Sequence, residues 1–93
     1  MAIDPDEAVL LPDVYQMSEK EAIDVLNKAG FMNVAPGPVC SGSVPGGLVR
    51  QVVVNDGAPV GKETILVDSK GPVQAVSRST PLFMKISTGK SCS

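Results

Sequence analysis

Residues that carry out chemistry are scarce in this chain. The sequence contains no histidine, which removes the commonest general base, the commonest zinc ligand and the usual activator of a serine or cysteine nucleophile. Gly89, Lys90 and Ser91 match the end of a phosphate-binding loop, but the first glycine of that motif would fall at Met84. The acidic residues near the N-terminus lack the spacing of a calcium loop. We therefore expect no enzyme activity, no catalytic residue, no metal site and no cofactor.

Two cations offer the sharpest binding hypothesis. Arg50 lies inside an apolar run, and Lys62 follows the turn after that run. Guanidinium and ammonium groups that lie together bind carboxylates. Arg50 with Lys62 is therefore the candidate ligand site, for the carboxylate of a peptide or of a partner's acidic side chain. The plainer alternative is that Arg50 is a solvent-facing strand residue.

Length and composition limit the class of protein. A chain of 93 residues holds one domain, and 43 % hydrophobic with 19 % charged residues is typical of a globular chain. The aromatic residues are only Tyr15, Phe31 and Phe83. Few aromatic platforms and a net charge of −2 argue against nucleic acid as a partner.

Membrane and export signals are also missing from the sequence. No apolar run approaches the roughly 20 residues that cross a bilayer, and the N-terminal stretch lacks the basic and apolar regions of a secretory signal. We expect no direct membrane insertion. The localisation stays open: extracellular if the domain belongs to a larger anchored protein, and otherwise the cytoplasm or a virus particle.

The two cysteines, Cys40 and Cys92, allow one bridge, and the sequence does not decide whether they pair. Because Cys92 lies in a polar tail, we interpret Cys40 as a small buried or half-buried thiol.

The clearest local signal is a helix that begins at about Glu19. Ser18 and Glu21 have the spacing of a capping box. Apolar residues then recur at three- and four-residue spacing, namely Ala22, Val25, Leu26 and Ala29. Gly30 supplies a positive φ just past the last turn, and Phe31 can fold back on the helix. The sequence therefore predicts one amphipathic helix with a single buried stripe.

Short strand-like runs follow the helix. The strongest covers residues 48–54, and two others cover residues 64–67 and 82–86. Within the first run, alternation puts Arg50, Val52 and Val54 on one face and Val49, Gln51 and Val53 on the other. Prolines interrupt a weaker run at residues 36–38, and residues 70–81 are expected to form a loop with a weak strand at residues 73–76.

Several motifs in this order resemble a PASTA domain. They are Leu11-Pro12-Asp13-Val14, Met17-Ser18, Glu21-Ala22 and Ala29-Gly30-Phe31, followed by Val44-Pro45-Gly46-Gly47 with Val49 and Gln51, and then Gly57 with Val60. The spacing after Gln51 departs from the family. Either residues 64–67 or residues 83–87 form the closing strand, and in the second case residues 64–80 are an insertion.

The resemblance implies an extracellular repeat of the kind found on bacterial penicillin-binding proteins and Ser/Thr kinases, where such repeats are linked to muropeptide or β-lactam recognition. Two functions are carried forward. One is a non-catalytic module that binds cell-wall peptide or glycan fragments or docks on a protein. The alternative is a stand-alone structural or assembly protein, such as a bacteriophage capsid decoration or another virion protein.

The expected fold class is α+β, with one amphipathic helix packed on a small antiparallel sheet of three strands, or four in the alternative. Residues 1–10 are expected to be a flexible segment, residues 11–89 a single PASTA-like domain and residues 90–93 a flexible tail. Because residues 48–54 are apolar on both faces, the sheet face away from the helix should keep exposed apolar side chains, which are some of Val49, Val53, Ile65, Val67 and Phe83. Val53 and Phe83 are the candidate partner contacts on that face.

Overall fold

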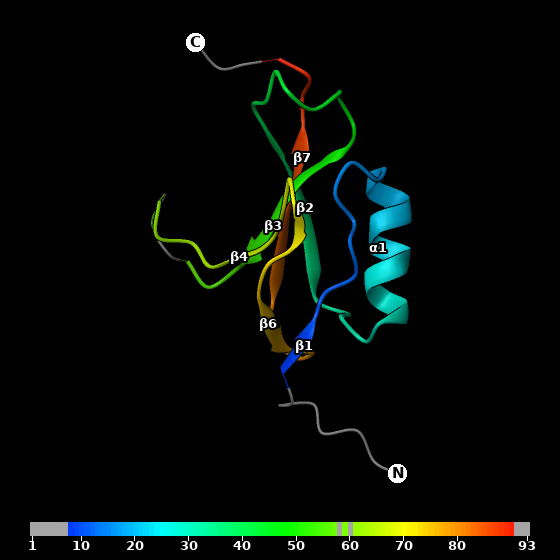
Figure 1. Cartoon of the computed structure of the whole chain (residues 1–93), viewed down its shortest axis with the longest axis vertical. Helices are drawn as coiled ribbons and strands as arrows, with labels where there is room; N and C mark the ends of the chain where they lie inside the picture. The colour runs from blue at the N-terminus through cyan, green and yellow to red at the C-terminus, as the bar shows by residue number, and fades with distance from the viewer. Residues whose placement is uncertain (1–7, 58, 60, 91–93) are drawn as a thin grey trace.

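The computed structural model describes residues 8–57, 59 and 61–90. The chain forms one helix and two sheets, in the order β1 (Ala8–Leu10), α1 (Glu19–Lys28), β2 (Val34–Val39), β3 (Val49–Val54), β4 (Ile65–Asp68), β5 (Gly71–Pro72), β6 (Ala75–Ser77) and β7 (Leu82–Ser87). The α+β arrangement with a helix against a sheet agrees with the sequence prediction (Figure 1).

The strand count and the strand directions differ from the expectation. The main sheet has five strands in the order β2-β7-β3-β4-β5, and β1 pairs with β6 in a second sheet of two strands. β2 and β7 are parallel, whereas the other neighbours in the main sheet are antiparallel. The prediction of a three- or four-stranded antiparallel sheet is therefore wrong. The last strand, β7, lies between β2 and β3 and joins them.

β2 is continuous through its two prolines. Leu82 donates to the carbonyl of Asn33, and Thr88 donates to that of Val39. The backbone polar groups of the odd-numbered residues of β2 thus point toward β7. Pro36 and Pro38 are even-numbered, so their nitrogen atoms, which carry no hydrogen, point away from β7. A proline is tolerated on such an edge strand because no ladder bond is lost.

A bulge in β3 changes which side chains face the core. Val49 pairs with Ile86 and Gln51 pairs with Lys85, so Arg50 is an extra residue on β3. Strict alternation predicted Val49 and Val52 on opposite faces, yet both are fully buried in the main core. The inserted residue shifts the alternation by one, which returns Val49 to the helix side.

The helix forms as its end signals predict. The Ser18 side chain accepts from the Glu21 amide at 3.3 Å. At the other end Gly30 has φ 103°, the Gly30 amide donates to Asn27, and the Phe31 amide donates to Leu26. These two bonds make a Schellman motif.

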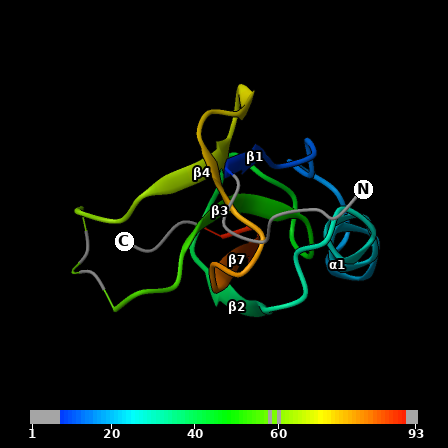
Figure 2. The ribbon, with the colours of Figure 1, turned by 90° about the horizontal axis from the view of Figure 1, so that it is seen from below.

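One hydrophobic core lies between α1 and the main sheet. Its buried members are Leu11, Val14, Ala22, Leu26, Phe31, Val49, Val52, Leu66, Val67, Leu82 and Met84. The view along the long axis shows α1 beside the strands and the connection between β3 and β4 extending away from it (Figure 2). The sheet therefore has one face toward α1 and one face away from it.

The two-stranded sheet of β1 and β6 is part of the folded unit. Val9 pairs with Val76, and both pack against the main core. Residues 8–10, which were expected to belong to a flexible segment, form β1, and the rest of that segment lies outside the described residues. The expected loop at residues 70–81 contains β5 and also β6, which overlaps the weak strand expected at residues 73–76 but ends one residue later.

Cys40 differs from the expected buried thiol, because it is exposed and disulfide-bonded. The other cysteine of the sequence, Cys92, lies outside the described residues. Among the described residues, no helix has the length and apolar character needed to cross a bilayer.

Candidate functional site

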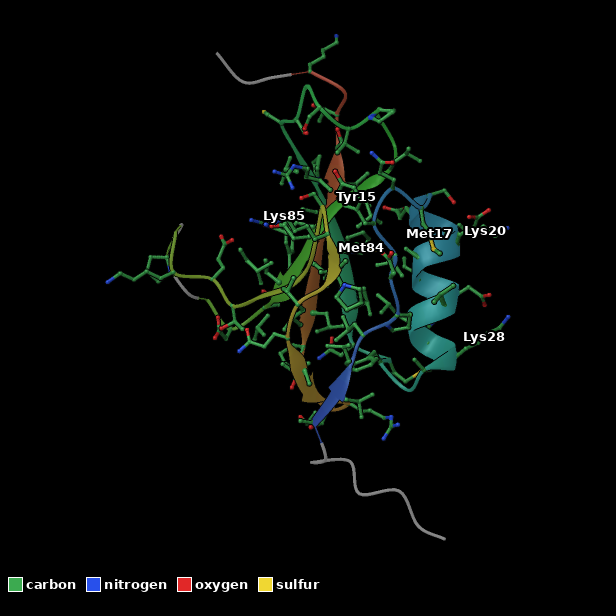
Figure 3. All side chains as sticks on the ribbon, viewed as in Figure 1. Tyr15, Met17, Lys20, Lys28, Met84 and Lys85 are labelled. Atoms are coloured by element: carbon green, nitrogen blue, oxygen red, sulfur yellow. The ribbon has the colours of Figure 1, made fainter. Side chains whose placement is uncertain are left out.

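The candidate site is the face of the main sheet turned away from α1, called here the outer face. On β7, Leu82 and Met84 are fully buried in the core, so the alternate residues Phe83 and Lys85 lie on the outer face. Figure 3 shows Lys85 pointing away from α1, on the side of the sheet opposite Met84. Register adds the outer-face residues of the neighbouring strands: Val53 and Gln51 on β3, Ile65 on β4, and Gly37 on β2.

An apolar row crosses the outer face. Val53 pairs with Phe83 on one side and with Ile65 on the other. Phe83 is half-buried and Ile65 is 36 % exposed. The row therefore ends in an accessible apolar side chain, as the two-faced apolar character of residues 48–54 indicated.

The ring of Phe83 lies against β2. A Cβ built on Gly37 would lie 2.5 Å from Cζ of Phe83, so the ring occupies the space that any side chain at this position would need. Gly37 is also the β2 partner of Lys85. The aromatic ring thus extends along β2 to the residue that is paired with Lys85.

A charged pair stands next to the apolar row. Lys85 Nζ lies 2.6 Å from Glu63 Oε2, and the two side chains are only 20 % and 21 % exposed. Glu63 comes from the connection between β3 and β4, whereas Lys85 belongs to the central strand. Alternation along residues 82–86 places Lys85 on this face, but sequence reasoning missed the residue, and no sequence signal identifies Glu63 as its partner.

The two cations predicted as a joint ligand site are not brought together. Arg50 Nη1 lies 3.2 Å from Asp68 Oδ1, with both side chains 35 % exposed. Lys62 is exposed beyond the opposite end of the β3–β4 ladder, where the Val54 amide donates to Thr64. The four-residue step from Arg50 to Val54 alone spans about 13 Å. Each cation therefore has to be considered separately.

The two predicted partner contacts have different surroundings. Val53 is 3 % exposed, so its side chain is not available to a partner in this structure. Phe83 is half-buried and remains accessible in part. Ile65 was expected only as one of several apolar residues that could remain exposed on this face, and it is the most exposed residue of the row.

The outer face combines two kinds of recognition. Lys85 on this face can hold a carboxylate, and Arg50, the extra residue of the β3 bulge, is a second cation on the same strand pair; each has an internal carboxylate partner in this structure. The accessible parts of Phe83 and Ile65 can take an apolar group on this face. Within the part of the chain that the structure describes, no three histidine, cysteine or acidic residues gather as metal ligands.

Comparison with known protein families places the chain in a defined class of binding module. The family model of the PASTA domain matches residues 9–68. The chain therefore belongs to the PASTA domain family, whose members are non-catalytic binding modules that bind peptidoglycan fragments. No curated protein sequence matches the chain.

The family match ends before the strand that holds the sheet together. Residues 9–68 include α1, β2, β3 and β4, but β7 lies outside the matched span and separates β2 from β3. Of the two candidate closing strands, residues 82–87 thus take the position between β2 and β3, and residues 65–68 extend the sheet on the far side of β3. Lys85 and Phe83 are accordingly contributed by the part of the chain that the family match does not reach.

Proposed function

We propose that this chain binds peptidoglycan fragments through its outer face. The observation that carries the proposal is membership of a family whose domains bind such fragments. The peptide stems of these fragments carry free carboxylates and small apolar side chains. Lys85, Phe83 and Ile65 offer matching chemistry on the outer face, and Arg50 adds a second cation on β3.

We prefer the outer face to the surface of α1 because its charged pair is better shielded from solvent. On α1, Lys28 is paired with Asp24 at 3.0 Å, and their side chains are 76 % and 63 % exposed. An ion pair so open to solvent is screened and contributes little to binding. The Lys85 pair is shielded, which strengthens its electrostatic interactions.

A titration of the isotope-labelled protein with a soluble disaccharide-peptide tests the proposal. We expect amide shifts concentrated on β3 and β7, at Gln51, Phe83 and Lys85, and weaker binding in Arg50→Ala. The variant Lys62→Ala tests separately whether Lys62, which was predicted together with Arg50, contributes to the affinity. Unchanged spectra at millimolar fragment would contradict the proposal, and shifts confined to α1 would contradict its placement.

Docking on a protein is the second candidate function, and it is favoured by the exposure of Ile65 at the end of the apolar row. A partner that covers Ile65 and Phe83 would complete the burial of this row. Because Val53 is buried, a charge there would damage the fold, so Ile65→Lys is the appropriate variant. We expect it to prevent protein association while leaving the helix signal in circular dichroism unchanged. Association that survives Ile65→Lys would exclude this surface.

A further inference from the structure

Lys85 lies within the main sheet and not at its edge. It lies on β7, the strand between β2 and β3, and its neighbours in register are Gly37 and Gln51. Neither neighbour carries a negative charge. Among the described residues, the carboxylate that the structure places on Lys85 comes from Glu63, a residue outside the strands and 22 positions away.

The Lys85–Glu63 pair is more enclosed than the other ion pairs of the described residues. Its side chains are 20 % and 21 % exposed, compared with 35 % for both members of the Arg50–Asp68 pair. A shielded ammonium without a carboxylate is unfavourable, because burial removes its hydration. Whatever covers Lys85 must therefore supply a negative charge.

Apolar surface lies beside this ammonium group. Phe83 is two residues away on the same face of β7, and its ring reaches over Gly37, the direct β2 neighbour of Lys85. The site thus places the Lys85 cation next to an aromatic ring and next to Gly37, which has no side chain. This combination suits a carboxylate that carries a small apolar group next to it.

We propose that Lys85 binds the carboxylate of a peptide ligand, and that Glu63 occupies this carboxylate position in the free protein. The inference rests on the proposed function for the identity of the ligand as a cell-wall peptide. On binding, the ligand carboxylate replaces that of Glu63, which turns to solvent, and the small side chain beside it packs on Phe83. A neutral ligand would separate Lys85 from Glu63 without replacing the charge, so the site selects free carboxylates.

Two small probes measure this selection directly. N-acetyl-alanine carries the free carboxylate, and N-acetyl-alaninamide is its neutral counterpart. Titration of the full chain is followed at the amides of Gly37, Phe83 and Lys85. We expect the acid to bind Glu63→Gln about three- to tenfold more tightly than the unaltered protein, because Lys85 loses its internal competitor. The acid should lose its effect on these amides in Lys85→Gln, and the neutral amide should bind all forms equally weakly.

Variants of the exposed pair on α1 provide matched controls. Asp24→Asn and Lys28→Gln make the same changes in net charge on the opposite side of the molecule. They should leave the affinity for N-acetyl-alanine unchanged. Equal effects of Asp24→Asn and Glu63→Gln would show that net charge alone is responsible, which would overturn the inference. Equal binding of the acid and the amide to Glu63→Gln would overturn it as well.

The muropeptide titration separates this inference from the proposed function. Fragment binding without any response of Glu63→Gln to N-acetyl-alanine would retain the proposed function and remove the role of Lys85. A response of Glu63→Gln to N-acetyl-alanine without any fragment binding would retain the carboxylate site and remove peptidoglycan as the ligand. Silence in both titrations would overturn both.

Discussion

The Phe83 ring on β7 fills the position of the missing side chain of Gly37 on β2, where a Cβ would lie 2.5 Å from the ring. These two residues come from parallel neighbouring strands, one inside the family match and one outside it. Gly37 is required here for space, since its φ is not positive. The contact fixes the orientation of the aromatic ring on the outer face.

Gly37→Ala should therefore disturb Phe83 rather than the backbone of β2. We expect a loss of about 1–3 kcal/mol in the free energy of unfolding, because the rigid ring has to leave its place. Phe83→Leu removes the clash, so the double variant should be less destabilised than the sum of the two single variants by at least about 0.5 kcal/mol. Denaturant unfolding of the four proteins measures this coupling, and additive losses would show that the two residues do not depend on each other.

The helix is the part of the fold that sequence reasoning predicted most completely. Its start at Ser18 and its end at Gly30 depend on residues within one or two turns, so local rules suffice. The sheet depended on longer-range information. The Arg50 bulge is fixed by pairing with β7, and the continuity of β2 through Pro36 depends on which edge of that strand stays open. Neither property can be read from the residues of one strand.

Two variants of the helix compare a cap with a core contact. Ser18→Ala removes the bond to the Glu21 amide and should lower the free energy of unfolding by about 1 kcal/mol. Leu26→Ala leaves a cavity in the main core and should lower it by about 2–5 kcal/mol. Negligible losses in both urea melts would contradict the packing of α1 on the sheet.

The end of the helix is also held by a residue outside the family match. Arg78 Nε donates to the carbonyl of Ala29 at 3.0 Å, and its Cδ lies 2.5 Å from the place of a Cβ on Gly30. A cation at this end is favoured by the helix dipole. The turn between β6 and β7 is thereby attached to the C-terminus of α1.

Gly30→Ala should be more damaging than the same change at Gly57. Both glycines have positive φ, 103° and 78°, so both alanine variants carry backbone strain of about 1–2 kcal/mol. Only Gly30 also meets the Arg78 side chain, whereas none of the described residues comes within 4 Å of a Cβ on Gly57. Thermal melts should show a clearly lower Tm for Gly30→Ala. Equal losses would mean that Arg78 moves aside freely.

The candidate site was predictable only in part. Phe83 was identified because the sheet has more apolar surface than the helix can cover, and Arg50 because it is a cation within an apolar run. Their partners were not, since Asp68 is 18 residues from Arg50 and Glu63 is 22 residues from Lys85. Such pairs depend on register and on the course of a connection. Lys62 was grouped with Arg50 as a second cation, but it lies beyond the end of the β3–β4 ladder that is opposite to Arg50.

The folding unit should extend beyond the span matched by the family. A chain that ends at Asp68 retains α1, β2, β3 and β4, but it lacks the strand that pairs with both β2 and β3. β2 would then have no hydrogen-bonded neighbour, and the core would lose Leu82 and Met84, both fully buried. We expect this truncated chain to be unfolded, with poorly dispersed amide resonances and no cooperative thermal transition.

Point variants in the full chain separate the loss of β7 packing from the effect of shortening. Met84→Ala removes a fully buried side chain from the central strand and should lower the free energy of unfolding by about 2–5 kcal/mol. Val73→Ala, at a position 54 % exposed in the same C-terminal part, should change it by less than about 0.5 kcal/mol. A cooperative transition in the chain ending at Asp68, together with a small effect of Met84→Ala, would show that residues 9–68 fold without β7. The five-stranded order would then not be what stabilises this domain.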